Sequence, residues 1–150
     1  MKVLELGACH GDTTRVFAEL FDKVYAVDRS EDNVQLIREK CKDVDNVECS
    51  VMDVTNDAWN FPQVDVVFVD ASHDYPQVAV DIQKCIDYFD NPLLILDDYG
   101  NPNNTNIRNS IDDKVREGKI NIHKKIGEGV GFLTKSGWKM IDREGVICKV

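Results

Sequence analysis

The stretch that decides the fold is Val-Leu-Glu-Leu-Gly-Ala-Cys-His-Gly, residues 3–11. Its apolar half predicts a short buried strand, because such a run next to turn residues is typical of a strand covered on both faces. Gly7 and Gly11 predict a tight loop, and Val16 and Leu20 then follow at helical spacing. A strand, a glycine loop and a helix N-terminus together predict a site for the polar or anionic parts of a nucleotide-like ligand.

The first hundred residues repeat this alternation of strand and helix. Strands are predicted at 3–6, 23–27, 47–52, 64–69 and 93–96, and helices at 12–20, after Ser30 and near Pro76. Residues 54–63 are too short and irregular to predict a helix. Five strands in this alternation predict a doubly wound, mostly parallel sheet.

The last third of the chain has a different pattern. A helix is predicted from Thr105 or Asn106, and strands are predicted at 120–123, 129–134, 138–141 and 146–150. The last two are expected to pair as a hairpin. We therefore expect an α/β fold with a seven-stranded, mostly parallel sheet and an antiparallel hairpin at its C-terminal edge. Residues 1–150 have the length of a single domain.

Composition excludes several classes of protein. The net charge of −9 argues against general affinity for nucleic acid. Five scattered cysteines without a Cys-x-x-Cys pair predict reduced thiols and no structural zinc. No apolar run reaches the ~20 residues that cross a bilayer, and the strand-like N-terminus predicts no signal peptide. We expect a cytoplasmic protein without membrane contact.

Charge is unevenly distributed along the chain. Residues 114–150 carry nine Lys and Arg against four acids, a net charge of +5, so residues 1–113 carry −14. The basic segment has two interpretations. It forms a solvated face of the late strands, or it contacts an anionic substrate or partner.

A carboxylate follows each predicted strand from the second to the fifth. These residues are Asp28, Asp53, Asp70, Asp97 and Asp98. In open α/β sheets, ligands bind beyond the carboxyl ends of the strands. Asp28 stands about 20 residues after the glycine loop, a spacing that suits hydrogen bonds to ribose hydroxyls, and Asp53 is placed to meet the base. For any one of these acids, a helix cap or a solvated loop position is the alternative.

With these residues in place, the chain resembles the S-adenosylmethionine-dependent methyltransferases of the Rossmann-like class. Residues 5–11 match their first motif, acid-x-Gly-x-x-x-Gly, although Cys9 stands where the family often has a further glycine. The resemblance covers about residues 1–100 and looks closest to the metal-dependent catechol-type O-methyltransferase branch. It implies S-adenosylmethionine as cofactor. The cofactor-binding residues that it implies are Glu5, Gly7, Ala8, Gly11, Thr13, Asp28, Arg29, Asp53 and Asp70.

That branch also binds a divalent metal through acids that end strands four and five. Asp70, Asp97 and Asp98 match this arrangement. Three carboxylates at adjacent strand ends repel one another unless a cation lies between them. Oxygen ligands favour Mg²⁺, Mn²⁺ or Ca²⁺. The alternative is that Asp97 or Asp98 caps its loop or bonds to Asn103 or Asn104.

His73 lies three residues after Asp70, where the catechol-type enzymes carry a lysine base. Histidine is suited to take a proton from a hydroxyl that a metal has acidified. Asp70 and His73 are therefore the predicted catalytic residues. The reaction that the resemblance implies is methyl transfer to a hydroxyl oxygen of a small molecule or sugar. The alternative for His73 is a surface position where a loop meets a helix.

Two other functions stay open at this point. Metal-dependent members of the family usually carry helices before the first strand that cover the active site, whereas this sequence begins at that strand. We therefore expect an open site or one that a partner subunit closes, for example in a homodimer. An inactive S-adenosylmethionine-binding module, or a subunit that needs a partner to complete its site, fits the same observation. A nicotinamide-dependent oxidoreductase is weaker, because the first loop lacks Gly-x-Gly-x-x-Gly.

Overall fold

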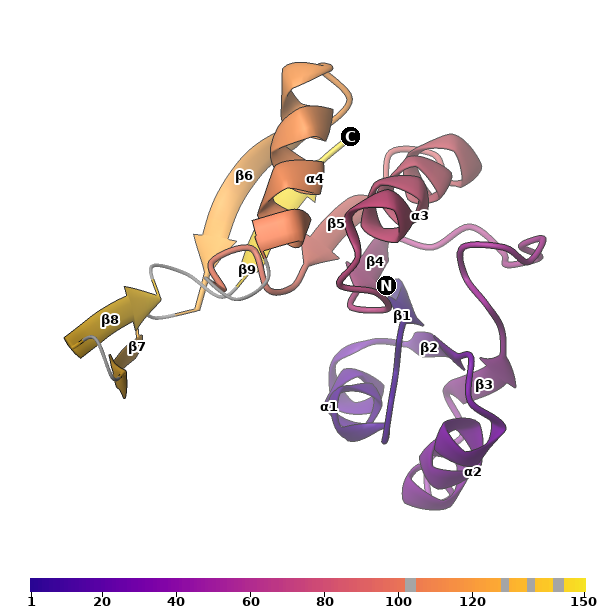
Figure 1. The fold of residues 1–150 in the computed structure, drawn as a ribbon. Helices are drawn as coiled ribbons and strands as arrows, with labels where there is room; N and C mark the ends of the chain where they lie inside the picture. Colours follow the sequence, from indigo (N-terminus) through magenta and orange to yellow (C-terminus); the bar gives the residue numbers. More distant parts are fainter. Residues whose placement is uncertain (102–104, 128–129, 135–136, 142–144) are drawn as a thin grey trace.

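The computed structural model describes residues 1–101, 105–127, 130–134, 137–141 and 145–150 (Figure 1). Its main feature is a seven-stranded sheet with the strand order β3-β2-β1-β4-β5-β9-β6. The elements of the first hundred residues are β1 (Lys2–Leu6), α1 (Asp12–Leu20), β2 (Lys23–Asp28), α2 (Glu31–Lys40), β3 (Val47–Val51), β4 (Val66–Val69), α3 (Tyr75–Tyr88) and β5 (Leu93–Leu96). Those that follow are α4 (Thr105–Arg116), β6 (Asn121–Ile126), β7 (Val130–Thr134), β8 (Gly137–Ile141) and β9 (Gly145–Lys149).

The first five strands run parallel, as the alternation of strand and helix predicts. β1 lies between β2 and β4, β3 pairs with β2 on one side, and β5 pairs with β4 on the other. The central strand β1 is buried over Val3–Leu6, which is why it reads as an almost unbroken apolar run. The doubly wound α/β fold with a seven-stranded sheet is therefore confirmed.

The antiparallel edge of the sheet forms, but the strands that pair there differ from the predicted ones. β9 pairs with both β5 and β6, while β7 and β8 pair with each other in a separate two-stranded sheet. The expected hairpin between 138–141 and 146–150 is thus wrong. Val146 and Cys148 are fully buried in the main sheet, and a two-stranded hairpin alone offers little such burial. Residue 129, the first of the predicted strand 129–134, lies outside the described residues.

Helices cover both faces of the sheet. α1 and α2 pack on one face, and α3 and α4 pack on the other, where Ile82 and Ile111 are fully buried (Figure 1). α2 begins as predicted, because Ser30 Oγ accepts a hydrogen bond from the N–H of Asn33. None of the helices in the described ranges is long and apolar enough to cross a membrane.

This topology fixes where a ligand site can form. Because the first five strands are parallel, their carboxyl ends meet at one rim of the sheet. The chain leaves β1 toward β2 on one side and β4 lies on the other, so the order reverses between β1 and β4. Ligands in open α/β sheets bind in the crevice at such a reversal.

Candidate active site

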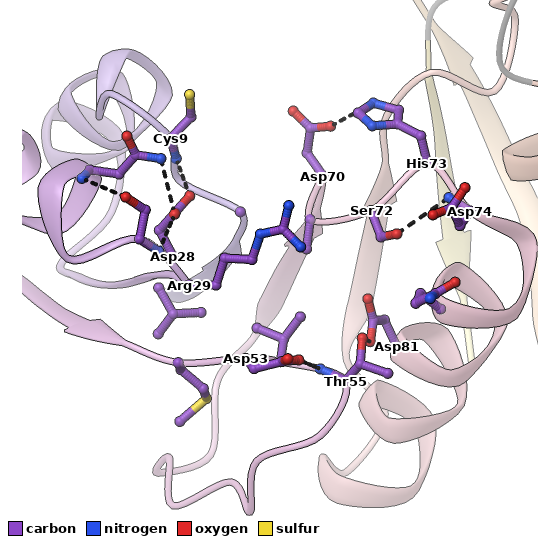
Figure 2. Close-up of a pocket in the computed structure, with 18 of the residues that line it drawn as sticks. Cys9, Asp28, Arg29, Asp53, Thr55, Asp70, Ser72, His73, Asp74 and Asp81 are labelled. Carbon is purple, nitrogen blue, oxygen red and sulfur yellow. Dashed lines mark hydrogen bonds and ion pairs between the residues drawn. The ribbon is translucent and has the colours of Figure 1, made fainter.

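A pocket of about 710 Å³ lies at this rim (Figure 2). Its volume falls within the ~300–1,000 Å³ that is usual for small-molecule sites. The structure brings together eight of the residues predicted from the sequence, which are Gly7, Asp28, Arg29, Asp53, Asp70, His73, Asp97 and Asp98. Four others, Glu5, Ala8, Gly11 and Thr13, lie outside its described lining.

The glycine loop lets the ends of β1 and β4 approach closely. Gly7 has a φ of +89°, and a Cβ on it would lie 2.3 Å from the backbone oxygen of Asp70. Gly11 has a φ of +76° where α1 begins, and a Cβ there would lie 3.1 Å from Cγ1 of Ile37. Both positions combine left-handed backbone with close packing, and glycine alone tolerates this without strain.

Three of the residues outside the lining lie in the loop or in the elements on either side of it. Glu5 is only 1% exposed, and it accepts a hydrogen bond of 2.5 Å from Oγ1 of Thr14. Burial raises the pKa of Glu5 to about 7. Ala8 is buried, and Thr13 is half-buried at the start of α1. The bond between Glu5 and Thr14 ties β1 to α1 across the loop, and the sequence reasoning did not anticipate the role of Thr14.

Asp28 fixes the end of β2 to both neighbouring segments. Its Oδ2 accepts the N–H of Cys9 at 2.9 Å. Its Oδ1 accepts the N–H of Ser30 at 2.9 Å and Nδ2 of Asn33 at 3.0 Å. Because each carboxylate oxygen can accept two hydrogen bonds, Oδ2 keeps one acceptor direction for a ligand. Cys9 reaches this contact with a φ of 47°, a conformation that L residues rarely adopt.

Asp53 lies at the end of β3, but its oxygens belong to a turn. Oδ1 accepts the N–H groups of Thr55 and Asn56, both at 3.2 Å, and Oδ2 accepts Nδ2 of Asn56 at 3.0 Å. The Asn56 side-chain amide, followed by its backbone N–H, lowers the pKa of Asp53 below its usual value. Of the two interpretations of this residue, the turn is the one that the structure shows, while contact with a base stays a prediction.

Asp81 on α3 is a residue of the pocket that the sequence reasoning missed. It is fully buried, and its Oδ1 accepts a hydrogen bond of 2.8 Å from Oγ1 of Thr55. Burial raises its pKa above the usual value. A signal was present in the sequence, because Asp81 shares the apolar face of the helix with Val78, Ile82 and Cys85. Burial of a charged residue costs free energy unless the residue is paired, so a charged residue on a buried face indicates a partner or a function.

His73 lies between two of the carboxylates at the other end of the pocket. Its Nε2 is 3.1 Å from Oδ2 of Asp98. The same atom is 3.9 Å from Oδ1 of Asp70, and Figure 2 shows these two side chains facing each other. Oδ1 of Asp98 accepts a hydrogen bond from Nδ2 of Asn101 at 3.0 Å. Burial, and then the charge of Asp97, raise the pKa of Asp70 to about 6, while His73 acts in the opposite direction.

The expected metal site is not supported by this geometry. Across the described part of the chain, no three His, Cys, Asp or Glu side chains are grouped so as to hold a metal ion. Asp70 and Asp98 instead face the imidazole of His73. The residues therefore do not fit a bound metal as they stand. The proposed contacts of Asn103 and Asn104 lie outside the described residues.

Comparison with known families decides the class of protein. A family model described as a methyltransferase domain matches residues 4–99. The chain belongs to this methyltransferase family. The match runs from β1 to the residues just after β5 and so includes every strand end that lines the pocket. The alternative of a nicotinamide-dependent oxidoreductase is therefore wrong. No curated protein sequence matches the chain.

Solved structures agree on the fold. One is an S-adenosylmethionine-dependent methyltransferase from Methanosarcina mazei, with a TM-score of 0.72 at 11% identity. The match covers 99% of the chain described here and 91% of the Methanosarcina chain. An rRNA methylase from Streptococcus thermophilus matches with a TM-score of 0.60 at 14% identity. This match covers 99% of the present chain and 84% of the methylase. Haemonchus contortus phosphoethanolamine N-methyltransferase 1, bound to S-adenosylhomocysteine, matches 64% of the present chain with a TM-score of 0.56 at 20% identity. This last match spans only 22% of that protein.

These relatives share the class I methyltransferase fold and differ in what they methylate. Neither they nor the family model places the chain in the catechol-type branch. The rRNA methylase, at 14% identity, shows the fold alone, so the expectation of no general nucleic-acid binding, drawn from the net charge, stays a prediction. The acceptor must therefore be argued from the pocket itself.

Proposed function

We propose that the chain transfers the methyl group of S-adenosylmethionine to a hydroxyl oxygen of a small molecule or sugar. The observation that carries this proposal is that one pocket has Asp28 at one end and His73 with its two carboxylates at the other. The first end suits a nucleoside, and the second suits the removal of a proton. A single bound cofactor can then extend from its nucleoside to the acceptor.

The cofactor end is argued from the free acceptor and donor groups of the loop. The remaining acceptor direction of Asp28 Oδ2 is available to a ribose hydroxyl. No side chain of the described residues caps the N-terminus of α1, so its first N–H groups, including that of Thr13, suit the carboxylate of the methionine part. Arg29 extends into the middle of the pocket (Figure 2), where it can contact the same carboxylate.

The acceptor end supplies a base. A neutral imidazole that donates its Nε2–H to Asp98 presents the lone pair of Nδ1 to a substrate hydroxyl. The hydroxyl proton moves to Nδ1, and the oxygen attacks the methyl carbon in line with the sulfonium. The carbon–sulfur bond breaks, and S-adenosylhomocysteine leaves as a neutral thioether. The charges of Asp98 and Asp70 stabilise the imidazolium that results.

The test is the production of S-adenosylhomocysteine by the full chain. The acceptors are a panel of small hydroxyl compounds and sugars, a matched panel of amines, and an rRNA fragment. The proposal expects product with hydroxyl acceptors only. Product with amines or RNA alone would contradict it. Calorimetric binding of S-adenosylmethionine without turnover on any acceptor would instead identify a cofactor-binding module.

A further inference from the structure

One buried oxygen of the pocket has no hydrogen-bond partner. Within the described part of the structure, Oδ2 of Asp81 is the buried side-chain oxygen that none of the protein's donors reaches. The side chain is fully buried, and its other oxygen already accepts the hydroxyl of Thr55. Buried polar atoms are nearly always paired in folded proteins, so an unpaired one at the wall of a pocket indicates a ligand that supplies the donor.

The nearest cation of the same helix cannot supply that donor. Lys84 directs its ammonium group to three backbone oxygens, those of Val54, Thr55 and Asp57. An ammonium group has three N–H donors, so these contacts use all of them. None of the residues that the structure describes therefore supplies the missing donor of Asp81, whereas a ligand in the pocket can.

Asp81 lies at the end of the pocket where the proposed cofactor places its base. It is joined through Thr55 to the turn that follows β3, and this turn contains Asp53 (Figure 2). Val27, Met52 and Val54 line the same pocket and offer apolar surface to a flat ring. An adenine placed against this surface carries an exocyclic amino group, and that group is a hydrogen-bond donor.

We propose that Oδ2 of Asp81 accepts a hydrogen bond from the exocyclic amino group of the cofactor's adenine. The inference rests on the proposed function, since it takes S-adenosylmethionine as the ligand. It assigns recognition of the base to a residue of α3, whereas the sequence assigns it to Asp53. Asp53 suits that role less well, because it is exposed and donors of its own turn contact both of its oxygens, whereas Oδ2 of Asp81 is buried and has no donor among the described residues.

The amino group gives the experiment a single-atom probe. Calorimetry on the full chain compares S-adenosylhomocysteine with its deaminated analogue S-inosylhomocysteine, in which a carbonyl replaces the amino group. We expect the wild type to bind the adenine form about tenfold to a hundredfold more tightly, the usual range for a hydrogen bond to a charged group. Equal affinities in the wild type would overturn the inference without any variant.

The substitution Asp81→Asn keeps the shape of the side chain and reverses its chemistry. With its oxygen still on Thr55, the amide presents N–H to the base, which suits the carbonyl of the deaminated analogue. We expect the ratio of the two affinities to fall at least about tenfold and to approach or pass one. The matched control is Asp87→Asn on the same helix, whose exposed carboxylate bonds to Gln83 outside the pocket lining. It should keep the wild-type ratio.

The outcomes separate this inference from the proposed function. A wild type that binds neither compound, and no S-adenosylmethionine, would reject the proposed cofactor itself. Tight binding of S-adenosylhomocysteine with the same affinity ratio in Asp81→Asn and wild type would leave the cofactor in place and reject the role of Asp81. A reduced melting temperature of Asp81→Asn with an unchanged ratio would show that Asp81 serves only the fold.

Discussion

Nε2 of His73 lies 3.1 Å from Oδ2 of Asp98 and thereby joins the segment after β4 to the end of β5. Asp98 holds this position with a φ of 57°, in the left-handed region. Residues kept in such conformations cluster at functional sites, where the surrounding structure enforces them. The contact orients the imidazole toward the pocket and keeps a negative charge beside it.

Replacement of the base should slow turnover and spare cofactor affinity. We expect His73→Ala to lower kcat by about 10²- to 10⁴-fold, the usual contribution of a general base. Asp98→Asn should lower it less, because the imidazole stays. The dissociation constant of S-adenosylhomocysteine should change little in either variant. His123→Ala on the exposed strand β6 is the matched control. Unchanged turnover in His73→Ala would disprove the assignment.

A chelator should leave turnover intact. His73 already provides the partner that Asp70 and Asp98 share in the described structure, so the reaction is expected to need no divalent ion. The measurement is S-adenosylhomocysteine formation in EDTA, followed by addition of Mg²⁺, Mn²⁺ or Ca²⁺ in excess. Activity that disappears in EDTA and returns with a metal would restore the metal site expected from the sequence and place His73 elsewhere in the active state.

Gly7→Ala should be far more harmful than Gly118→Ala. Both glycines have positive φ, but a Cβ at Gly7 would overlap the backbone of Asp70, whereas a Cβ at Gly118 meets nothing within 4 Å. Gly118→Ala should therefore cost only the backbone strain, about 1 kcal/mol. Gly7→Ala should add a steric cost of about 3 kcal/mol or more and abolish cofactor binding. Equal melting temperatures of the two variants would contradict this packing.

Stability should fall as the pH rises through 7, and Glu5 should be the cause. Its pKa in the folded protein is raised to about 7, so the folded state holds a proton that the unfolded state has already released. The stabilisation from this proton is complete at low pH and is lost as the folded carboxyl ionises. Between pH 6 and 8 the loss should amount to about 1 kcal/mol.

Denaturant unfolding of the wild type and Glu5→Gln at these pH values measures the effect. The amide cannot ionise, but it can still accept the hydroxyl of Thr14. The variant should therefore lose most of the difference between pH 6 and 8. An identical pH dependence in both proteins would mean that another group carries it.

Local pattern was enough to predict the parallel half of the fold. Most of the first five strands are short apolar runs with turn residues beside them, and their partners follow from the handedness of the crossovers. The edge was harder, because β9 inserts between β5 and β6, which lie far from it in sequence. A local alternation of residues 138–141 and 146–150 contains no information about such distant partners.

In the pocket, too, some features could be predicted from local sequence, and others depend on contacts between distant residues. Acids that end strands are visible in the sequence, and the topology brings Asp28, Asp53 and Asp70 to one rim. Whether a carboxylate is already engaged depends on donors that the pattern does not reveal, such as the turn around Asp53. Asp81 was missed because helix α3 reaches the pocket through packing, and no strand-end rule points to it.

The charges that line the pocket have a consequence for the reaction cycle. In the described lining, seven aspartates stand against Arg29; they are Asp28, Asp53, Asp70, Asp74, Asp81, Asp97 and Asp98. In the proposed reaction the sulfonium that enters is positive and the thioether that remains is neutral, so this acidic field attracts fresh cofactor more than spent cofactor. Each methyl transfer thus removes the charge that held the nucleoside in place and favours its exchange for the next one.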